Sequence, residues 1–377
     1  MFLTQFAKDN NTKEDHWLHD ITTISSYSQT LKQVKWGKNK ENDKLPQLNL
    51  ALTQGQISNL PFYYRKLAGN ISDVSTIKQL VADFETLKMI ENKPKLVMDR
   101  GFYSKANIDL LLKNKYEFLL SVKKSLGFVR EALESVYDVI TSFEHYDVQY
   151  ELYSVTVPIE WGFVGGVDRR LFLHLFFDID RAAEDKKAFD RELVLMRGEL
   201  LSGKRKAEHV EGYKKYFSVK EIPVEGDSSG GSGVGRFVVV VDEVAVGLAK
   251  RFFGFFALLS SESLGAVSAL EVYRNRDLVE KAFGDVKDRL SLRRTLVSSE
   301  QSLDGKLFVC YVGLIFLSYV KGCMQRAGLF EHYILQGLFD CLDVIECFEY
   351  SDGSLRVGEV TEKQKQLYKA LGVDPPT

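Results

Sequence analysis

The succession of apolar and polar segments predicts an α/β fold interrupted by a long, mostly β insertion. Strand-like and helix-like periods alternate over residues 17–122. Residues 123–272, which are richer in strand-forming residues, separate that region from a charged, helical segment at residues 273–287. The composition agrees, because 45% hydrophobic and 12% aromatic residues in a chain of 377 argue against disorder.

The first region is predicted to contain five strands and two helices. Its opening run, Trp17 to Tyr27, is rich in β-forming residues and carries Asp20 near its start. Asp73 is a good N-cap for a helix through Ile90, and a second helix covers residues 104–113. The predicted strands are 17–27, 48–53, 61–67, 96–99 and 116–122.

The order of these elements is three strands, helix, strand, helix, strand. This is the order of a ribonuclease H-like α/β fold, and it places Asp20 and Asp99 on neighbouring strands. We therefore expect the two carboxylates to lie at one site.

The remaining chain is predicted to divide into an insertion, the rest of the catalytic core and a tail. In the insertion we expect a charged helix and a mobile, Gly/Ser-rich loop at residues 225–236. Its expected strands are 150–157, 170–177 and 237–244, and its helix is 179–201. The predicted domains are a residual segment 1–16, core 17–125, insertion 126–262, core 263–330 with a buried helix at 303–320, and a helical tail 331–377.

Charge and cysteine content narrow the classes of function. The formal charge of −2 is no argument for a dedicated nucleic-acid binder, but nine basic against three acidic residues between Lys93 and Arg130 can hold phosphates locally. The four cysteines show neither zinc-site spacing nor a disulfide framework, which favours a reduced, cytoplasmic protein. The longest apolar run, Leu307 to Val320, is too short for a membrane span, and no signal peptide is evident.

The most informative motif is the spacing Y-x2-R-x3-E-x6-K, formed by Tyr273, Arg276, Glu280 and Lys287. In one continuous helix these residues share a face, which presents an aromatic ring, two cations and a carboxylate together. Such a face suits metal-bound phosphate. Mixed charges of this kind more commonly form a solvated helix face with ion pairs, so the motif needs its context.

This motif resembles the signature helix of bacterial insertion-sequence transposases with a DDE active site. Asp99, in Met-Asp-Arg-Gly-Phe-Tyr-Ser, resembles the second aspartate of that family, and Asp20, in His-Asp-Ile-Thr-Thr, resembles the first. Glu280 is then the third carboxylate. The resemblance implies that Asp20, Asp99 and Glu280 are the catalytic, metal-binding residues, which hold Mg²⁺ or Mn²⁺ as a pair of ions.

The resemblance also implies DNA contacts. The Arg and Lys of the signature helix hold phosphates of the DNA end, and the Tyr contacts the backbone. The aromatic Trp161 in the insertion is a candidate for stacking on a flipped base, although a Trp in such a segment is more often part of the core. The expected DNA-binding residues are Tyr273, Arg276, Lys287, Arg100, Arg293, Arg294 and Trp161.

The implied activity is metal-dependent hydrolysis at transposon ends, followed by strand transfer in which the freed 3′-hydroxyl attacks another strand. Double-stranded DNA and a homodimer assembled on it are the implied partners, with no membrane and a nucleoid-associated location. Only nineteen residues precede Asp20, so the chain resembles an N-terminally truncated copy. Two alternatives stay open: a catalytically inactive remnant that binds DNA or the full-length enzyme, and a ribonuclease H-like nuclease.

Other residues give weaker signals. The loop Gly231 to Gly235 resembles a nucleotide-binding loop only superficially, since no Lys-Ser/Thr pair follows it. His16 and His19 could bind a metal in a helix, but a strand would point them to opposite faces. We interpret these histidines as structural.

Overall fold

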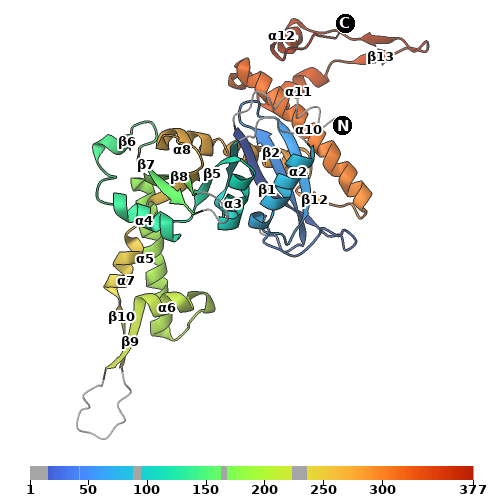
Figure 1. Cartoon of the computed structure of the whole chain (residues 1–377). Coiled ribbons are helices and arrows are strands. Elements are labelled where there is room, and N and C mark those ends of the chain that lie inside the picture. The colour runs from blue at the N-terminus through green and yellow to red at the C-terminus, as the bar shows by residue number, and fades with distance from the viewer. Residues whose placement is uncertain (1–15, 42, 88–94, 163–167, 223–235, 377) are drawn as a thin grey trace. The chain divides into compact units, whose positions relative to one another are not determined.

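The computed structural model describes residues 16–41, 43–87, 95–162, 168–222 and 236–376. The chain divides into two compact units, one comprising residues 1–120 and 271–377 and the other residues 121–270 (Figure 1). The predicted segment 1–15, the end of the helix predicted to reach Ile90 and most of the Gly/Ser-rich loop lie outside the described residues.

A mixed sheet organises the first unit. Its strand order is β3-β2-β1-β4-β5, in which the pairs β1–β2 and β2–β3 are antiparallel and the pairs β1–β4 and β4–β5 are parallel. A short strand, β12, pairs in parallel with β1. The five predicted strands are all present. Their bounds are β1 (His16–Ser26), β2 (Gln47–Gly55), β3 (Pro61–Ala68), β4 (Lys95–Met98) and β5 (Glu117–Val122), with β12 at Arg294–Thr295.

Strand β1 is buried along almost its whole length. Trp17 is fully buried, and its ring lies 4.4 Å from that of Phe62 on β3 and 5.1 Å from that of Phe84 on the covering helix. Burial of such large rings dominates core energetics. The β-forming composition of β1 is therefore matched by its central place in the sheet.

Two helices follow the predicted order but one begins later than expected. Asp73 does not cap an α-helix: it opens the 3-10 turn η1 (Asp73–Ser75), because the N–H of Thr76 bonds the Asp73 carbonyl three residues back. Helix α2 (Ile77–Leu87) starts after it. The turn η2 (Arg100–Phe102) and helix α3 (Lys105–Lys113) follow β4, and the Ser104 side chain caps α3.

The predicted continuous helix over residues 273–287 is wrong. The structure has α8 (Ala266–Arg274), then α9 (Asp277–Gly284), then a π-helix, η5 (Asp285–Arg289). Between α8 and α9, the N–H groups of Arg276 and Leu278 bond carbonyls three residues back, and this tighter pattern replaces the α-helical one. The motif spacing is compatible with helical segments but does not reveal this break.

Helix α10 (Glu300–Arg326) packs on β3 of the first unit. Tyr311 is buried, donates a hydrogen bond to the Pro61 carbonyl at 2.9 Å, and lies 4.6 Å from Tyr64 between ring centroids. By length and composition alone α10 could cross a membrane, but Leu303, Leu307 and Leu314 are buried in the fold. The predicted helix is thus present and longer than predicted, but it is only partly buried, because Phe308, Val309, Phe316 and Tyr319 are exposed.

The C-terminal region packs on the end of α10. Its elements are the turn η6 (Leu329–Glu331), α11 (Leu335–Asp343), the hairpin β13 (Cys347–Glu349) and β14 (Leu355–Val357), and α12 (Glu362–Ala370). A capping box at Thr361 and Gln364 begins α12. A small core joins the helices: Cys323, Met324, Leu335, Leu338, Leu367 and Leu371. The tail therefore contains more than the one predicted helix.

The second unit contains an antiparallel sheet with the order β11-β8-β7-β6. The strands are β6 (Tyr146–Asp147), β7 (Leu152–Trp161), β8 (Arg169–Phe177) and β11 (Phe255–Ser260). Helix α4 (Gly127–Val136) and the turn η3 (Phe143–His145) precede them, and α4 contacts β8. Neither α4 nor β11 is among the predicted elements.

The long helix α5 (Ile179–Ser202) contacts α6 and β10, which belong to the rest of the second unit. Asp178 caps its start and Gly203, at φ 70°, ends it in the left-handed conformation that favours glycine. The remaining elements are η4 (Ala207–His209), α6 (Val210–Tyr216), the hairpin β9 (Phe217–Ile222) and β10 (Arg236–Val241), and α7 (Glu243–Lys250). Met196, Tyr213, Phe217 and Val239 form their shared core.

The prediction of a mostly β insertion is wrong for the part of this unit that the structure describes. Helices α4, α5, α6 and α7 together cover more of it than the strands do. The predicted strand over residues 237–244 ends at Val241, and Asp242 caps α7 instead.

His174 joins three strands of the second unit. Its Nδ1 lies 2.9 Å from Thr156 Oγ1 on β7, and its Nε2 lies 3.0 Å from Ser260 Oγ on β11. Burial lowers the pKa of His174 to about 4. The folded protein therefore holds this imidazole neutral where the unfolded chain would already take up a proton.

We expect His174 to make folding sensitive to acid. Since the unfolded pKa is the higher one, its contribution is complete above about pH 6.5 and falls by about 1.4 kcal/mol per pH unit between there and pH 4. Urea unfolding of His174→Gln at pH 7 and pH 5 should lack the His174 share of the decline, while the share of the buried His19 remains. The matched control is His332→Gln at an exposed position, which should keep it. An identical pH dependence in His174→Gln and wild type would contradict this assignment.

Candidate active site

The sheet of the first unit brings the two predicted aspartates together. His19 on β1 pairs with Met98 on β4 in parallel register, so Asp20 and Asp99 come one residue later on neighbouring strands. Asp99 also caps η2, because its carboxylate accepts a hydrogen bond from the N–H of Arg100 at 2.7 Å. The predicted proximity of the two carboxylates is thus present in the structure.

Asp20 is a buried carboxylate. Its side chain is 10% exposed, and its Oδ1 accepts a hydrogen bond from the Ile21 N–H at 2.7 Å. Burial raises the pKa of Asp20, and the nearby charge of Asp99 raises it further, while Lys40 and Arg276 act in the opposite direction. Charge repulsion between Asp20 and Asp99 means that the site favours the binding of cations.

Arg276 connects two of the three predicted carboxylates. Its Nη1 lies 3.1 Å from Asp20 Oδ2, and its Nη2 lies 2.6 Å from Glu280 Oε1. The guanidinium is 16% exposed, and its Nε is buried with no hydrogen-bond partner among the described residues. Burial acts to lower the pKa of Arg276, but Tyr273, Asp20 and Glu280 raise it above its ordinary value. The arginine therefore stays charged between the carboxylates.

Tyr273 contacts Asp99, the predicted carboxylate that is not among the ion-pair partners of Arg276 given above. Its hydroxyl donates a hydrogen bond to Asp99 Oδ1 at 3.2 Å, and its ring centroid lies 5.7 Å from the guanidinium carbon of Arg276. The turn between α8 and α9 places Tyr273 and Arg276 at the end of one helix and the start of the next. Tyr273, Arg276 and Glu280 consequently meet Asp20 and Asp99 at one site despite the break in the helix.

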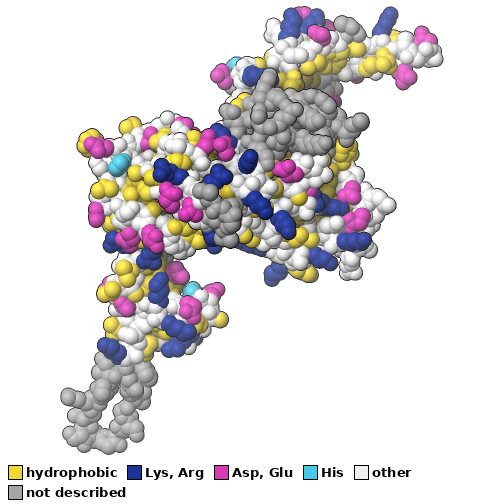
Figure 2. All heavy atoms as spheres, in the orientation of Figure 1, with side chains coloured by type: hydrophobic (Ala, Val, Ile, Leu, Met, Phe, Trp, Pro, Cys, Tyr) yellow, Lys and Arg dark blue, Asp and Glu magenta, His cyan; other side chains and the backbone are white. Residues whose placement is uncertain are grey.

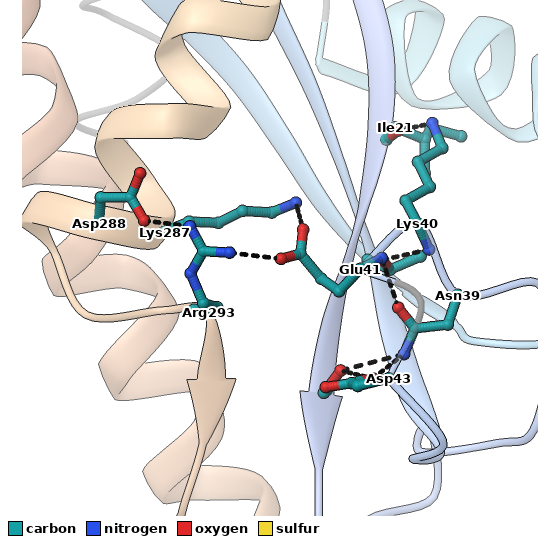
Figure 3. A network of polar contacts seen from close by, with 10 residues as sticks. Ile21, Asn39, Lys40, Glu41, Asp43, Lys287, Asp288 and Arg293 are labelled. Carbon is teal, nitrogen blue, oxygen red and sulfur yellow. Dashed lines mark hydrogen bonds and ion pairs between the residues drawn. The ribbon is translucent and has the colours of Figure 1, made fainter.

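Lys287 lies apart from these contacts. It belongs to the π-helix η5, and its ammonium bonds the carboxylate of Glu41 from the β1–β2 connection (Figure 3). Arg293 bonds the other oxygen of Glu41 at 2.7 Å and also reaches Asp288 at 2.5 Å. The predicted DNA-binding cations Lys287 and Arg293 thus share one internal anion.

Two residues that the sequence did not single out for this site, Lys40 and Glu41, contribute charge to it. Lys40 Nζ lies 3.8 Å from Asp20 Oδ1 and 4.0 Å from Asp73 Oδ2. Burial raises the pKa of Asp73, and Asp99 raises it further while Lys40 opposes the shift. The run of charges around Lys40 has no motif spacing, so no sequence signal distinguished it from a solvated loop.

The other predicted residues have different surroundings. Arg100 is exposed directly after Asp99. Arg294 on β12 is half exposed, lies 3.5 Å from Asp43 and bonds the hydroxyl of Tyr27. Trp161 is buried in the second unit, with its ring at 5.7 Å from that of Phe128, so its indole is not available for stacking on a base in this conformation.

Gly101, directly after Arg100, lies close to the Asp73 carboxylate. A Cβ at this position would lie 3.1 Å from Asp73 Oδ2. The glycine thus allows the carboxylate of Asp73 to approach the loop after β4. The histidines of β1 behave as predicted at one position: His19 is buried, its Nδ1 is bonded to Thr53 Oγ1 at 2.8 Å, and burial lowers its pKa to about 3.

The donor set fits a hard divalent cation only in part. Carboxylate oxygens are the ligands that Mg²⁺ and Mn²⁺ prefer, and Asp20 and Asp99 provide them on adjacent strands. Glu280 is separated from Asp20 by the guanidinium of Arg276. In the part of the chain that the structure describes, no group of three His, Cys, Asp or Glu side chains is arranged to hold a metal ion. A bound ion would therefore require Glu280 or Arg276 to move.

The described surface on the face drawn in Figure 2 carries charges of both signs. Figure 2 shows acidic and basic side chains intermingled over the described surface of this face of the molecule. This agrees with the formal charge of −2. Any contact with a polyanion would then depend on local groups such as those around Arg276.

Comparison with known proteins identifies the family. A family model described as "Transposase DDE domain" matches residues 11–316. The chain belongs to the DDE transposase family. Members of this family are polynucleotidyl transferases that act in DNA transposition.

Other comparisons add little to the transposase assignment. No curated protein matches the chain. Among solved structures, the chain is similar to the piggyBac transposase in a synaptic complex with hairpin DNA, with a TM-score of 0.39 and 10% identity. The match covers 95% of this chain and 51% of that one, so this chain spans about half the length of the piggyBac protein.

We expect the fold of the transposase domain to depend on Arg276. Replacing it by Met retains much of the side-chain length but leaves Asp20 buried without its closest cation, which should lower the free energy of unfolding by about 3 kcal/mol. Urea denaturation near neutral pH measures the loss. The double variant Asp20→Asn/Arg276→Met should recover part of it, because position 20 then carries no buried charge, and Glu280, which also loses Arg276, is 49% exposed. Equal stability of wild type and Arg276→Met would contradict the pairing.

Proposed function

We propose that this chain catalyses metal-dependent hydrolysis of phosphodiester bonds at transposon ends, followed by strand transfer through the freed 3′-hydroxyl. The observation that carries the proposal is the meeting of Asp20, Asp99 and Glu280, from three distant segments, around Arg276 and Tyr273. Membership of the DDE transposase family supports it. Such a site combines ligands for a cation with donors for phosphate.

In this proposal the first unit is a ribonuclease H-like domain and the second is its insertion. The strand order β3-β2-β1-β4-β5, with three antiparallel strands followed by two parallel ones, supports the first assignment. The chain enters the second unit after β5 and leaves it within α8, which supports the second. The catalytic residues then all belong to the first unit.

Asp20, Asp99 and Glu280 would hold Mg²⁺ or Mn²⁺, which would polarise the phosphodiester and activate water or the 3′-hydroxyl. Asp20 has the strongest need for a cation, because burial and Asp99 both disfavour its charged form. Tyr273 fixes Asp99 through its hydroxyl. Arg276, with its permanently charged planar fork, is suited to exchange a carboxylate for a phosphate oxygen as DNA arrives.

We propose that DNA is held mainly by cations of the first unit. Lys287 and Arg293 are adjacent, since both bond Glu41, and Arg100 and Arg294 are exposed. Contacts of this type neutralise phosphates and weaken with salt. Trp161 is not included in this set, because its indole is buried.

Metal binding tests the three carboxylates. Wild type should bind Mn²⁺ in calorimetry, and both Asp99→Asn and Glu280→Gln should weaken that binding by roughly tenfold or more, because each removes a charged oxygen ligand. Nicking of DNA in the presence of Mn²⁺ should be lost in both variants. Glu331→Gln, at an exposed position remote in sequence from the motif, is the matched control and should behave like wild type.

The opposite outcomes are equally informative. Undiminished Mn²⁺ binding in both variants would remove Asp99 and Glu280 from the metal site. A folded wild-type chain that binds DNA but neither binds Mn²⁺ nor nicks DNA would replace the catalytic proposal by that of an inactive DNA-binding remnant.

A further inference from the structure

Two consecutive residues of the β1–β2 connection, Lys40 and Glu41, pair with opposite halves of the candidate active site. Lys40 lies among the carboxylates and Glu41 among the cations, and Figure 3 shows the two side chains pointing in different directions from one turn. Each therefore places its charge where a ligand of the same sign would be expected, a metal cation for Lys40 and a phosphate for Glu41. Lys40 thus carries the charge of a bound cation, and Glu41 carries the charge of a bound phosphate.

Glu41 forms ion pairs with both Lys287 and Arg293. Its Oε1 bonds the ammonium of Lys287 and its Oε2 lies 2.7 Å from Nη1 of Arg293. Its side chain is 16% exposed and that of Lys287 is 12% exposed, so the carboxylate covers the ammonium. A phosphate group offers the same arrangement of neighbouring anionic oxygens. Phosphate can reach Lys287 only if the Glu41 side chain turns away.

Lys40 forms ion pairs with two carboxylates, Asp20 and Asp73. Its Nζ lies within 4.0 Å of both Asp20 and Asp73, and it also donates to the Ile21 carbonyl on β1. Its side chain is 41% exposed, so it can leave for solvent without disturbing the core. The ammonium supplies positive charge to a site where burial and Asp99 disfavour the anionic form of Asp20.

The backbone of the turn is fixed independently of these two side chains. The side-chain Nδ2 of Asn39 donates hydrogen bonds to Asp43 and to Ser25 Oγ on β1. The side-chain Oδ1 of Asn39 accepts a hydrogen bond from the Glu41 N–H at 2.7 Å. Next to the turn, Lys35 and Gln47 bond each other through their backbones. Rotation of the Lys40 and Glu41 side chains therefore needs no unfolding of the turn.

We infer that Lys287 and Arg293 form a single site for one phosphate group, and that Glu41 occupies this site while Lys40 neutralises the carboxylates, until DNA and a divalent cation displace both side chains. The inference rests on the proposed function and adds an internal competitor to it. The two side chains are displaced by different ligands: the phosphate displaces Glu41, and the divalent cation displaces Lys40.

The anion half of the inference is tested with Glu41→Gln. This variant keeps a hydrogen-bond acceptor for Lys287 and removes the competing charge, so it should bind a short fluorescent DNA duplex roughly fivefold more tightly than wild type in an anisotropy titration. Glu362→Gln is the control: it removes the same charge from an exposed ion pair with Lys365 and measures the gain from net charge alone.

The result that would overturn the inference is clear-cut. If Glu41→Gln, folded by circular dichroism, binds DNA no better than Glu362→Gln, or more weakly than wild type, Glu41 positions the cations and does not compete for them. Normal binding by wild type without a gain in Glu41→Gln overturns this inference alone. Failure of wild type and both variants to bind DNA overturns the DNA-binding proposal as well.

The cation half has its own test, which does not depend on DNA. Calorimetry with Mn²⁺ should show several-fold tighter binding by Lys40→Met than by wild type, because the ion no longer displaces an ammonium. Lys365→Met, which breaks an exposed pair with Glu362, should leave the affinity unchanged. Weaker Mn²⁺ binding by Lys40→Met would show that Lys40 helps to position Asp20 for the metal, and would overturn this half.

Discussion

The contact between Arg276 and Asp20 is the constraint on which the site depends. Asp20 lies in a central strand that is buried along almost its whole length, and a buried carboxylate needs a compensating charge. Arg276 supplies it and extends to Glu280, so residues 256 positions apart in sequence become neighbours. The break between α8 and α9 follows from the same requirement, because it places Arg276 at the start of α9 beside β1.

Opposite charges in the site pair with one another internally at several points. Arg276 and Lys40 neutralise Asp20, and Glu41 neutralises Lys287 and Arg293. A polyanion and a divalent cation compete with these pairs, so their binding exchanges internal contacts for external ones. Charge exchange of this kind gives less net affinity than the number of charges suggests, but it makes binding selective for ligands that bring both signs together.

Local patterns predicted the sheet of the first unit well, since β-forming runs and turn residues act over a few positions. The resemblance to the transposase family pointed to Asp20, Asp99 and Glu280, and the structure places Asp20 and Asp99 directly after paired positions on adjacent strands, while their catalytic role stays a prediction. Three features could not be predicted from local sequence patterns. The break at Arg276 leaves the motif spacing intact, Glu41 meets Lys287 across 246 positions of sequence, and helices α4, α6 and α7 of the second unit were not predicted, although α5 was.

The π-helix η5 has an evolutionary consequence. A π turn accommodates one more residue than an α turn, so Asp285–Arg289 can be regarded as an α-helix that has absorbed a single-residue insertion. Loss of that residue could be accommodated by the backbone, but it would rotate Lys287 by about 100° relative to α9. Descendants that shorten this segment by one residue would therefore keep their fold while uncoupling the cation of the motif from its carboxylate, and substitution elsewhere would have to restore the register.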